Sequence, residues 1–123
     1  MALNKNKMTK HYVMDKDGFV RSVANVLEWA KQFESADRRI AFTDTGDGEV
    51  STVFLGLDHN FCGKGPPILF ETLIFRTSKT HDQDMWRYGT KAKALVGHGL
   101  AVNLLRARIA YEEACKKAKV STQ

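Results

Sequence analysis

The sequence predicts an α+β fold: a three-to-four-stranded antiparallel meander with a short N-terminal helix and a long C-terminal helix packed on the sheet. Its length of 123 residues corresponds to one domain. Apolar runs separated by glycine-rich turns occupy the middle of the chain, which is typical of short strands. The last third holds a long proline-free run with apolar residues every three or four positions, which indicates a helix. We expect residues 1–10 to form a flexible segment and residues 11–123 to form the domain.

The first elements after the flexible segment are predicted to be a hairpin and the short helix. Residues 11–14 are predicted to form a short strand, residues 15–18 a turn that Gly18 closes, and residues 19–20 the returning strand. Asn25, with Glu28 three residues later, forms the capping-box pattern that opens a helix, and the amphipathic run continues through Phe33.

Three strands are then predicted at residues 39–43, 50–58 and 68–76, with a loop at 60–67 before the third. Their order and the shortness of the first turn favour an antiparallel meander. Both faces of the second and third strands are apolar, whereas a sheet with one face in water should alternate apolar and polar residues. We therefore expect a helix on each face, or a helix on one face and a partner subunit on the other.

The long helix is predicted over residues 91–117. Its apolar stripe is expected to consist of Leu95, His98, Val102, Leu105 and Ile109. A helix of this length extends about 40 Å, while a nine-residue strand covers about 30 Å, so the helix should overhang the sheet. The turns from about Glu112 are either a solvated, lysine-rich end or a contact with another copy. Because the apolar surface exceeds what one chain of this size usually buries, we expect a homo-oligomer.

The net charge of +5 is concentrated at the two ends of the chain. Residues 1–21 and 106–123 each hold five basic and two acidic residues, whereas residues 22–105 hold nine basic and ten acidic residues. A solvated tail and a cationic helix end explain this distribution, so nucleic-acid binding is possible but not favoured.

The composition bears on localisation. No run of about 18 apolar residues exists, so no membrane span is expected, and no hydrophobic signal segment is visible. We expect a cytosolic protein in which Cys62 and Cys115 are free thiols, because their spacing matches neither a metal nor a redox motif.

Five polar residues inside apolar elements are the first candidates for chemistry: Asp58, His59, Glu71, Thr72 and His98. Burying such groups without partners costs about 1–3 kcal/mol each. Two imidazoles and two carboxylates could form a metal or acid-base group, although their spacing matches no known metal motif. Alternatively, Asp58 caps the loop, His59 lies at a surface rim, and Glu71 pairs with His98 or an arginine. We predict that Glu71 and His98 lie within hydrogen-bond reach, directly or through one water.

Two further segments could recognise a ligand. Lys64 lies in a glycine- and proline-rich loop whose backbone could face a phosphate, although such a loop more often serves as a turn. Arg87 and Tyr88, together with Trp86, could stack on and ion-pair with a nucleotide, or anchor a loop over the core.

Several segments of the chain are distinctive enough to compare with known families. The segment Val50–His59 reads V-S-T-V-F-L-G-L-D-H, residues 65–75 contain F-E-T-L-I-F, and Arg87–Tyr88 is followed by the pair Gly97–His98. These segments resemble a family of small uncharacterised bacteriophage proteins, and the likeness extends from about residue 17 to residue 102. It implies phage origin and expression in a bacterial cytoplasm, and it brings no established activity.

The sequence departs from the family pattern at two places. Gly89 stands where the family has serine, and residues 92–94 lack the acidic residue that precedes the Gly-His pair. If that acidic residue supports a site in the family, the site is incomplete here, which disfavours catalysis.

The function predicted from these observations is that of a phage accessory protein acting by binding, without a cofactor. It would counter bacterial defence through a host protein or by sequestering a nucleotide-type signal in the host cytoplasm. The alternative is a small metal-dependent hydrolase or nuclease that uses His59, Glu71 and His98.

Overall fold

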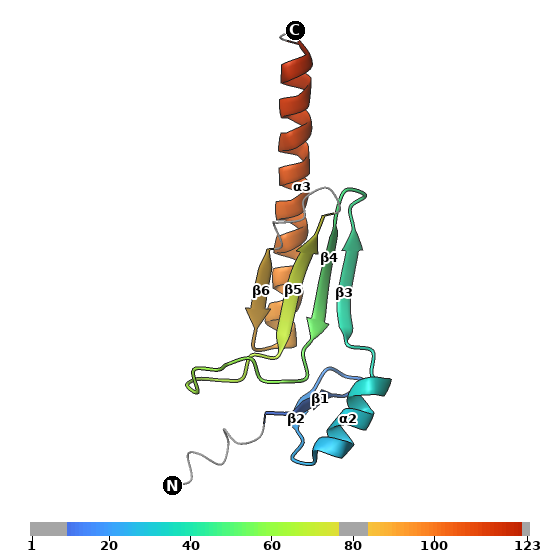
Figure 1. Ribbon diagram of the computed structural model, residues 1–123, viewed down its shortest axis with the longest axis vertical. Helices are drawn as coiled ribbons and strands as arrows, with labels where there is room; N and C mark the ends of the chain where they lie inside the picture. The colour runs from blue at the N-terminus through green and yellow to red at the C-terminus, as the bar shows by residue number, and fades with distance from the viewer. Residues whose placement is uncertain (1–9, 77–83, 122–123) are drawn as a thin grey trace.

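The structure of the protein, a computed structural model, describes residues 10–76 and 84–121. It confirms the α+β fold, with a two-stranded and a four-stranded antiparallel sheet and two helices in the described ranges (Figure 1). Apart from Lys10, the segment expected to be flexible lies outside these ranges. In chain order the elements are β1 (Tyr12–Met14), β2 (Val20–Ser22), α2 (Val26–Ser35), β3 (Arg39–Asp44), β4 (Glu49–Phe54), β5 (Phe70–Phe75), β6 (Met85–Tyr88) and α3 (Lys91–Ser121).

The larger sheet is the expected meander, in the order β3-β4-β5-β6. Sequence analysis did not locate β6, and it placed the end of β4 at residue 58, four residues too late. The β4 ladder ends earlier because Gly56 adopts a positive φ of 75° and turns the chain toward β1. There the amide of Tyr12 donates to the carbonyl of Gly56 at 2.8 Å, so the small sheet joins the end of the large one.

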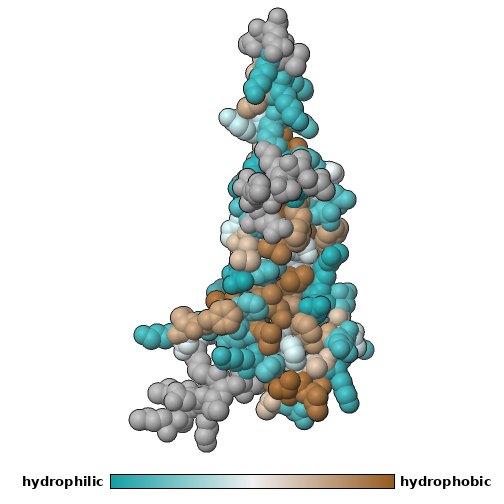
Figure 2. All heavy atoms as spheres, viewed as in Figure 1, coloured by the Kyte–Doolittle hydropathy of each residue, from teal (hydrophilic) through white to brown (hydrophobic). Residues whose placement is uncertain are grey.

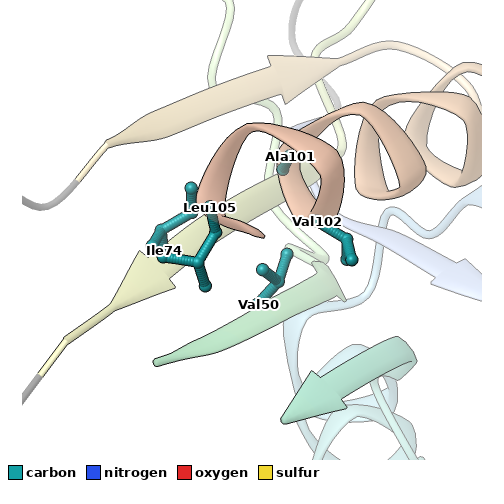
Figure 3. Packing of buried hydrophobic residues seen from close by; sticks show 5 residues of the cluster. All are labelled: Val50, Ile74, Ala101, Val102 and Leu105. Atoms are coloured by element: carbon teal, nitrogen blue, oxygen red, sulfur yellow. The ribbon is translucent and has the colours of Figure 1, made fainter. Parts of the chain in front are cut away.

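Helix α3 covers one face of this sheet. The core between them consists of Val50, Ile74, Ala101, Val102 and Leu105, and these side chains point toward one another in Figure 3. The opposite face of the sheet has no helix on it in the described part of the chain, because α2 packs against β1. Figure 2 shows apolar residues gathered over the sheet. Phe42, Phe75 and Met85 belong to this open face and are exposed.

The small lobe consists of β1, β2 and α2, and Trp29 holds it against the sheet. The predicted cap is confirmed: Asn25 Oδ1 accepts hydrogen bonds from the amides of Leu27 and Glu28. Trp29 Nε1 donates to the carbonyls of Tyr12 at 3.0 Å and Gly56 at 3.1 Å. One indole therefore bridges the two sheets.

The 31-residue helix α3 is about 46 Å long against about 20 Å for a six-residue strand, and its C-terminal turns protrude beyond the sheet (Figure 1). The predicted overhang is confirmed. The predicted stripe needs one correction: Leu95 is 45% exposed, and Ala94 is fully buried instead. Ala94 and His98 lie one turn apart on the line facing the sheet, and Leu95 is rotated to its side.

Arg76 fixes α3 where the helix leaves the sheet. Its buried guanidinium donates from Nη1 and Nη2 to both carboxylate oxygens of Glu112, at 2.9 and 2.8 Å, and from Nη2 to Asp47 at 2.5 Å. These carboxylates raise the pKa of Arg76 further above its usual range. The protruding turns of α3 therefore begin at a rigid, charge-paired anchor.

Candidate ligand-binding site

His98 lies in a polar network between α3 and the sheet. The imidazole is 8% exposed, with Nδ1 2.7 Å from Thr52 Oγ1 and Nε2 2.9 Å from Thr43 Oγ1. Thr52 Oγ1 also lies 2.6 Å from Thr72 Oγ1. Burial lowers the pKa of His98, which favours the neutral ring with one donor and one acceptor nitrogen. Both nitrogens are bonded within the core, so His98 is a structural residue here.

The predicted contact between Glu71 and His98 is wrong. Glu71 lies on the open face of the sheet, while its neighbour Thr72 faces α3, because successive side chains of a strand alternate between faces. Glu71 instead accepts a hydrogen bond from Arg87 Nε at 3.0 Å on the adjacent strand. The alternative expectation, a pairing of Glu71 with an arginine, is the arrangement present.

The candidate residues Asp58, His59 and Lys64 belong to the loop before β5, and the side-chain hydrogen bonds of Asp58 and His59 lie within this segment. Asp58 Oδ1 accepts hydrogen bonds from the amides of Asn60 at 2.8 Å and Ile68 at 2.9 Å, which is the predicted capping role. His59 Nδ1 bonds to the carbonyl of Leu57 at 2.8 Å. Lys64 is exposed at the tip of the loop.

His59, Glu71 and His98 therefore lie in a loop, on the open sheet face and in the core, respectively. Within residues 10–76 and 84–121, no group of three His, Cys, Asp or Glu side chains could hold a metal ion. The set of residues required by the hydrolase or nuclease alternative is not assembled.

The candidate residues on β6 lie on opposite faces of the sheet. Tyr88 faces α3, whereas Arg87 points to the opposite face and pairs with Glu71. A Cβ atom at Gly97 would lie 2.1 Å from the hydroxyl oxygen of Tyr88, so only glycine lets the helix approach this ring. Trp86 packs against the core cluster. Trp86 and Tyr88 therefore anchor β6 under α3, and because Arg87 lies on the opposite face, the three residues do not form the predicted nucleotide-stacking group.

A cleft that the sequence did not predict lies between the β1–β2 turn, the C-terminal end of α2 and the start of β3. It consists of two adjoining cavities of about 290 and 530 Å³. Both are lined by residues 14–16 and 35–37. The inner cavity has an apolar floor that includes Tyr12, Phe33 and Phe54. Burial and the charge of Asp58 raise the pKa of Tyr12 above its ordinary value.

The rim of the cleft carries an excess of positive charge. Four cationic side chains line it: Lys16, Arg38, Arg39 and Lys91. None of them forms an ion pair with the described residues. The two carboxylates of the rim accept hydrogen bonds from turn amides, Asp15 from residues 17 and 19 and Asp37 from residue 39. The cleft thus combines an apolar floor with two net positive charges and suits an anion that has an apolar part.

One part of this cleft is a cluster of charged residues that the sequence shows directly, the run Asp37-Arg38-Arg39, which lies within the segment that resembles the phage family. The other parts lie about twenty residues earlier and fifty residues later along the chain, at Lys16 and Lys91. No periodicity or spacing connects these segments, so only the fold brings them together.

The chain matches no family model, no curated protein and no solved structure. In the described residues, no helix is both long and apolar enough to cross a membrane. Cys62 and Cys115 are free, as expected.

Proposed function

We propose that the protein is a bacteriophage accessory protein that binds an anionic, nucleotide-like small molecule in the cleft between β1, α2 and β3. Binding would occur in the cytoplasm of the infected host and would withdraw a nucleotide-type signal from a bacterial defence. The observation that carries this proposal is a set of four cations that form no ion pair with the described residues: Lys16 and Arg38 line the cavity with the apolar floor, and Arg39 and Lys91 line the adjoining cavity. The phage context is supported by the resemblance of residues 17–102 to a phage family.

Nucleotides combine a flat, weakly polar base with phosphate groups, and the cleft offers a surface for each part. The guanidinium carbon of Arg38 lies 4.1 Å from the centroid of the Phe33 ring, so its plane is already held at the cleft wall. Planar guanidinium groups bind phosphate through paired hydrogen bonds, and lysines add point charges. A cavity of about 290 Å³ is near the lower limit for small-molecule sites, and the adjoining cavity enlarges it.

The composition of the cleft supports binding rather than chemistry. Its lining contains neither histidine nor cysteine. The carboxylates of Asp15 and Asp37 bond to backbone amides of their own turns, where they stabilise the walls. A serine or cysteine nucleophile is normally activated by an adjacent base such as histidine, and the lining of the cleft offers no such pair.

Thermal unfolding of the full chain with AMP, ADP, ATP and cyclic GMP tests the proposal. A nucleotide present at ten times its dissociation constant stabilises the native state by about 1.4 kcal/mol, which raises Tm by about 5 °C. The variant R38E/R39E should lose this shift. The control K64E/K117E changes the net charge equally at exposed sites outside the cleft and should keep it.

Two results would contradict the proposal. If no nucleotide raises the Tm of the wild-type protein, the cleft does not bind this ligand class, and recognition of a host protein becomes the better account of the accessory role. If both double variants lose the shift equally, the nucleotides respond to net charge and not to the cleft.

A further inference from the structure

We propose that a second copy of this chain packs along the outer face of α3 and forms an antiparallel homodimer. The outer face is the side of the helix turned away from the sheet. It consists of Val96, Leu100, Leu104, Ala107, Tyr111, Ala114 and Ala118. This inference is independent of the proposed ligand cleft.

The outer face repeats with the spacing of a helix–helix interface. Its members follow one another at intervals of three or four residues, so they form a continuous stripe along the helix. Val96 is 66% exposed, Leu100 64% and Tyr111 71%. Because the opposite side of α3 is already buried against the sheet, the helix is apolar on two sides, which is typical of a helix with two partners.

The exposed area is large enough for an interface between two copies. The four large side chains of the outer face present roughly 500 Å² per copy, which is toward the upper end of the largest apolar patches on soluble monomers, and such patches are often functional. Two copies would bury about 1,000 Å² from these residues alone, which reaches the lower limit for a specific interface. The alanines of the stripe add to this area.

The distribution of large and small residues favours a second copy over another partner. Val96 and Leu100 lie toward the start of α3, whereas Ala114 and Ala118 lie toward its end. An antiparallel two-fold axis near Ala107 places Val96 opposite the partner's Ala118 and Leu100 opposite the partner's Ala114, so the two ends of the stripe are complementary to each other.

A groove next to the outer face provides a seat for the largest side chain. It has a volume of about 300 Å³ and lies between β6 and α3, where Trp86, Tyr88 and Leu104 line it. The two-fold arrangement brings the partner's Tyr111 beside Leu104, on the flank of α3 that borders the groove. An exposed tyrosine is a typical anchor for such an interface.

Sedimentation equilibrium of the full chain at 50 μM tests the dimer. The wild-type protein should have twice the monomer mass of 13.9 kDa. The variant L100E/Y111E should sediment as a monomer with an unchanged far-ultraviolet circular dichroism spectrum. The control L27E/F61E introduces two charges at equally exposed apolar sites outside α3 and should remain a dimer.

The competing interface is the open face of the sheet, and F42E/M85E tests it. Retention of the dimer in F42E/M85E supports the proposal. A monomeric wild-type protein at 50 μM overturns it. A dimer that persists in the L100E/Y111E variant also overturns the proposal, and so does a dimer that is lost in the F42E/M85E variant. If L100E/Y111E changes the circular dichroism spectrum, the milder variant L100Q replaces it in the test. The dissociation constant of the L100Q dimer should be at least ten times that of the wild-type dimer, and an unchanged constant contradicts the proposal.

Discussion

Replacing Thr52 with valine tests whether the buried polar network stabilises the fold. The side chain is fully buried, and valine has nearly the same shape, so the change removes a hydroxyl without opening a cavity. Two hydrogen bonds are lost, one to His98 Nδ1 at 2.7 Å and one to Thr72 Oγ1 at 2.6 Å. Each is worth about 1 kcal/mol net, and leaving His98 Nδ1 without a partner adds about 1–2 kcal/mol.

We therefore expect Thr52→Val to lower the free energy of unfolding by about 3–4 kcal/mol, measured by urea denaturation at pH 7.5. Thr43→Val is the matched control, because Thr43 is only part-buried and makes a single hydrogen bond, to His98 Nε2. It should cost about 1 kcal/mol. Equal losses in the two variants, or a loss below 1 kcal/mol for Thr52→Val, would refute the assigned network.

Three further changes address the packing of α3. Because the pKa of His98 is lowered in the folded protein, the unfolded state binds a proton on this residue more readily. The contribution of His98 to the free energy of unfolding is therefore complete above pH 6.5 and is lost as the pH falls. The loss is at most about 1.4 kcal/mol for each pH unit. The stability difference between the wild type and His98→Gln should shrink between pH 8 and pH 5, and a constant difference would exclude this titration. Gly97→Ala should cost at least about 2 kcal/mol in urea denaturation, because the new methyl group overlaps the Tyr88 ring. Glu112→Gln should lower the free energy of unfolding by about 2–3 kcal/mol, since Arg76 is buried and loses a paired charge.

Two controls separate these effects from general damage to the helix. Gly99→Ala lies in the same helix with no atom within 4 Å of the new methyl group, so it should stabilise the protein by up to about 1 kcal/mol. A comparable loss in Gly99→Ala would show that the Gly97 effect does not arise from Tyr88. Glu113→Gln changes an exposed neighbour of Glu112 and should alter stability by less than about 0.5 kcal/mol.

The parts of the fold that depend on local sequence signals were predictable. Asn25 caps α2 as expected, and the proline-free run after residue 90 forms one helix that overhangs the sheet. Strand β6 was missed because Met85–Tyr88 is only four residues long and mixes large apolar, charged and aromatic residues. Its pairing with β5, a tertiary contact, makes it a strand.

The candidate site was less accessible to sequence reasoning. The apolar stripe correctly turned His98 toward the sheet, but both faces of β5 carry apolar residues, so the pattern did not show on which face Glu71 lies. The partners that His98 uses are threonines, which are common in strands for their β-branched shape and give no separate signal. The cleft joins segments that are distant in the chain.

The anchor formed by Arg76 and Glu112 divides α3 into two regions of different local stability. Amide protons before Glu112 lie over the sheet, so their exchange with deuterium requires opening of the core. The turns after it have no sheet beside them (Figure 1), and helical segments of about ten residues are marginal in water. In an isolated chain their amides exchange by fraying from the C-terminus. Hydrogen exchange along α3 should therefore change abruptly near residue 112 in a dilute sample.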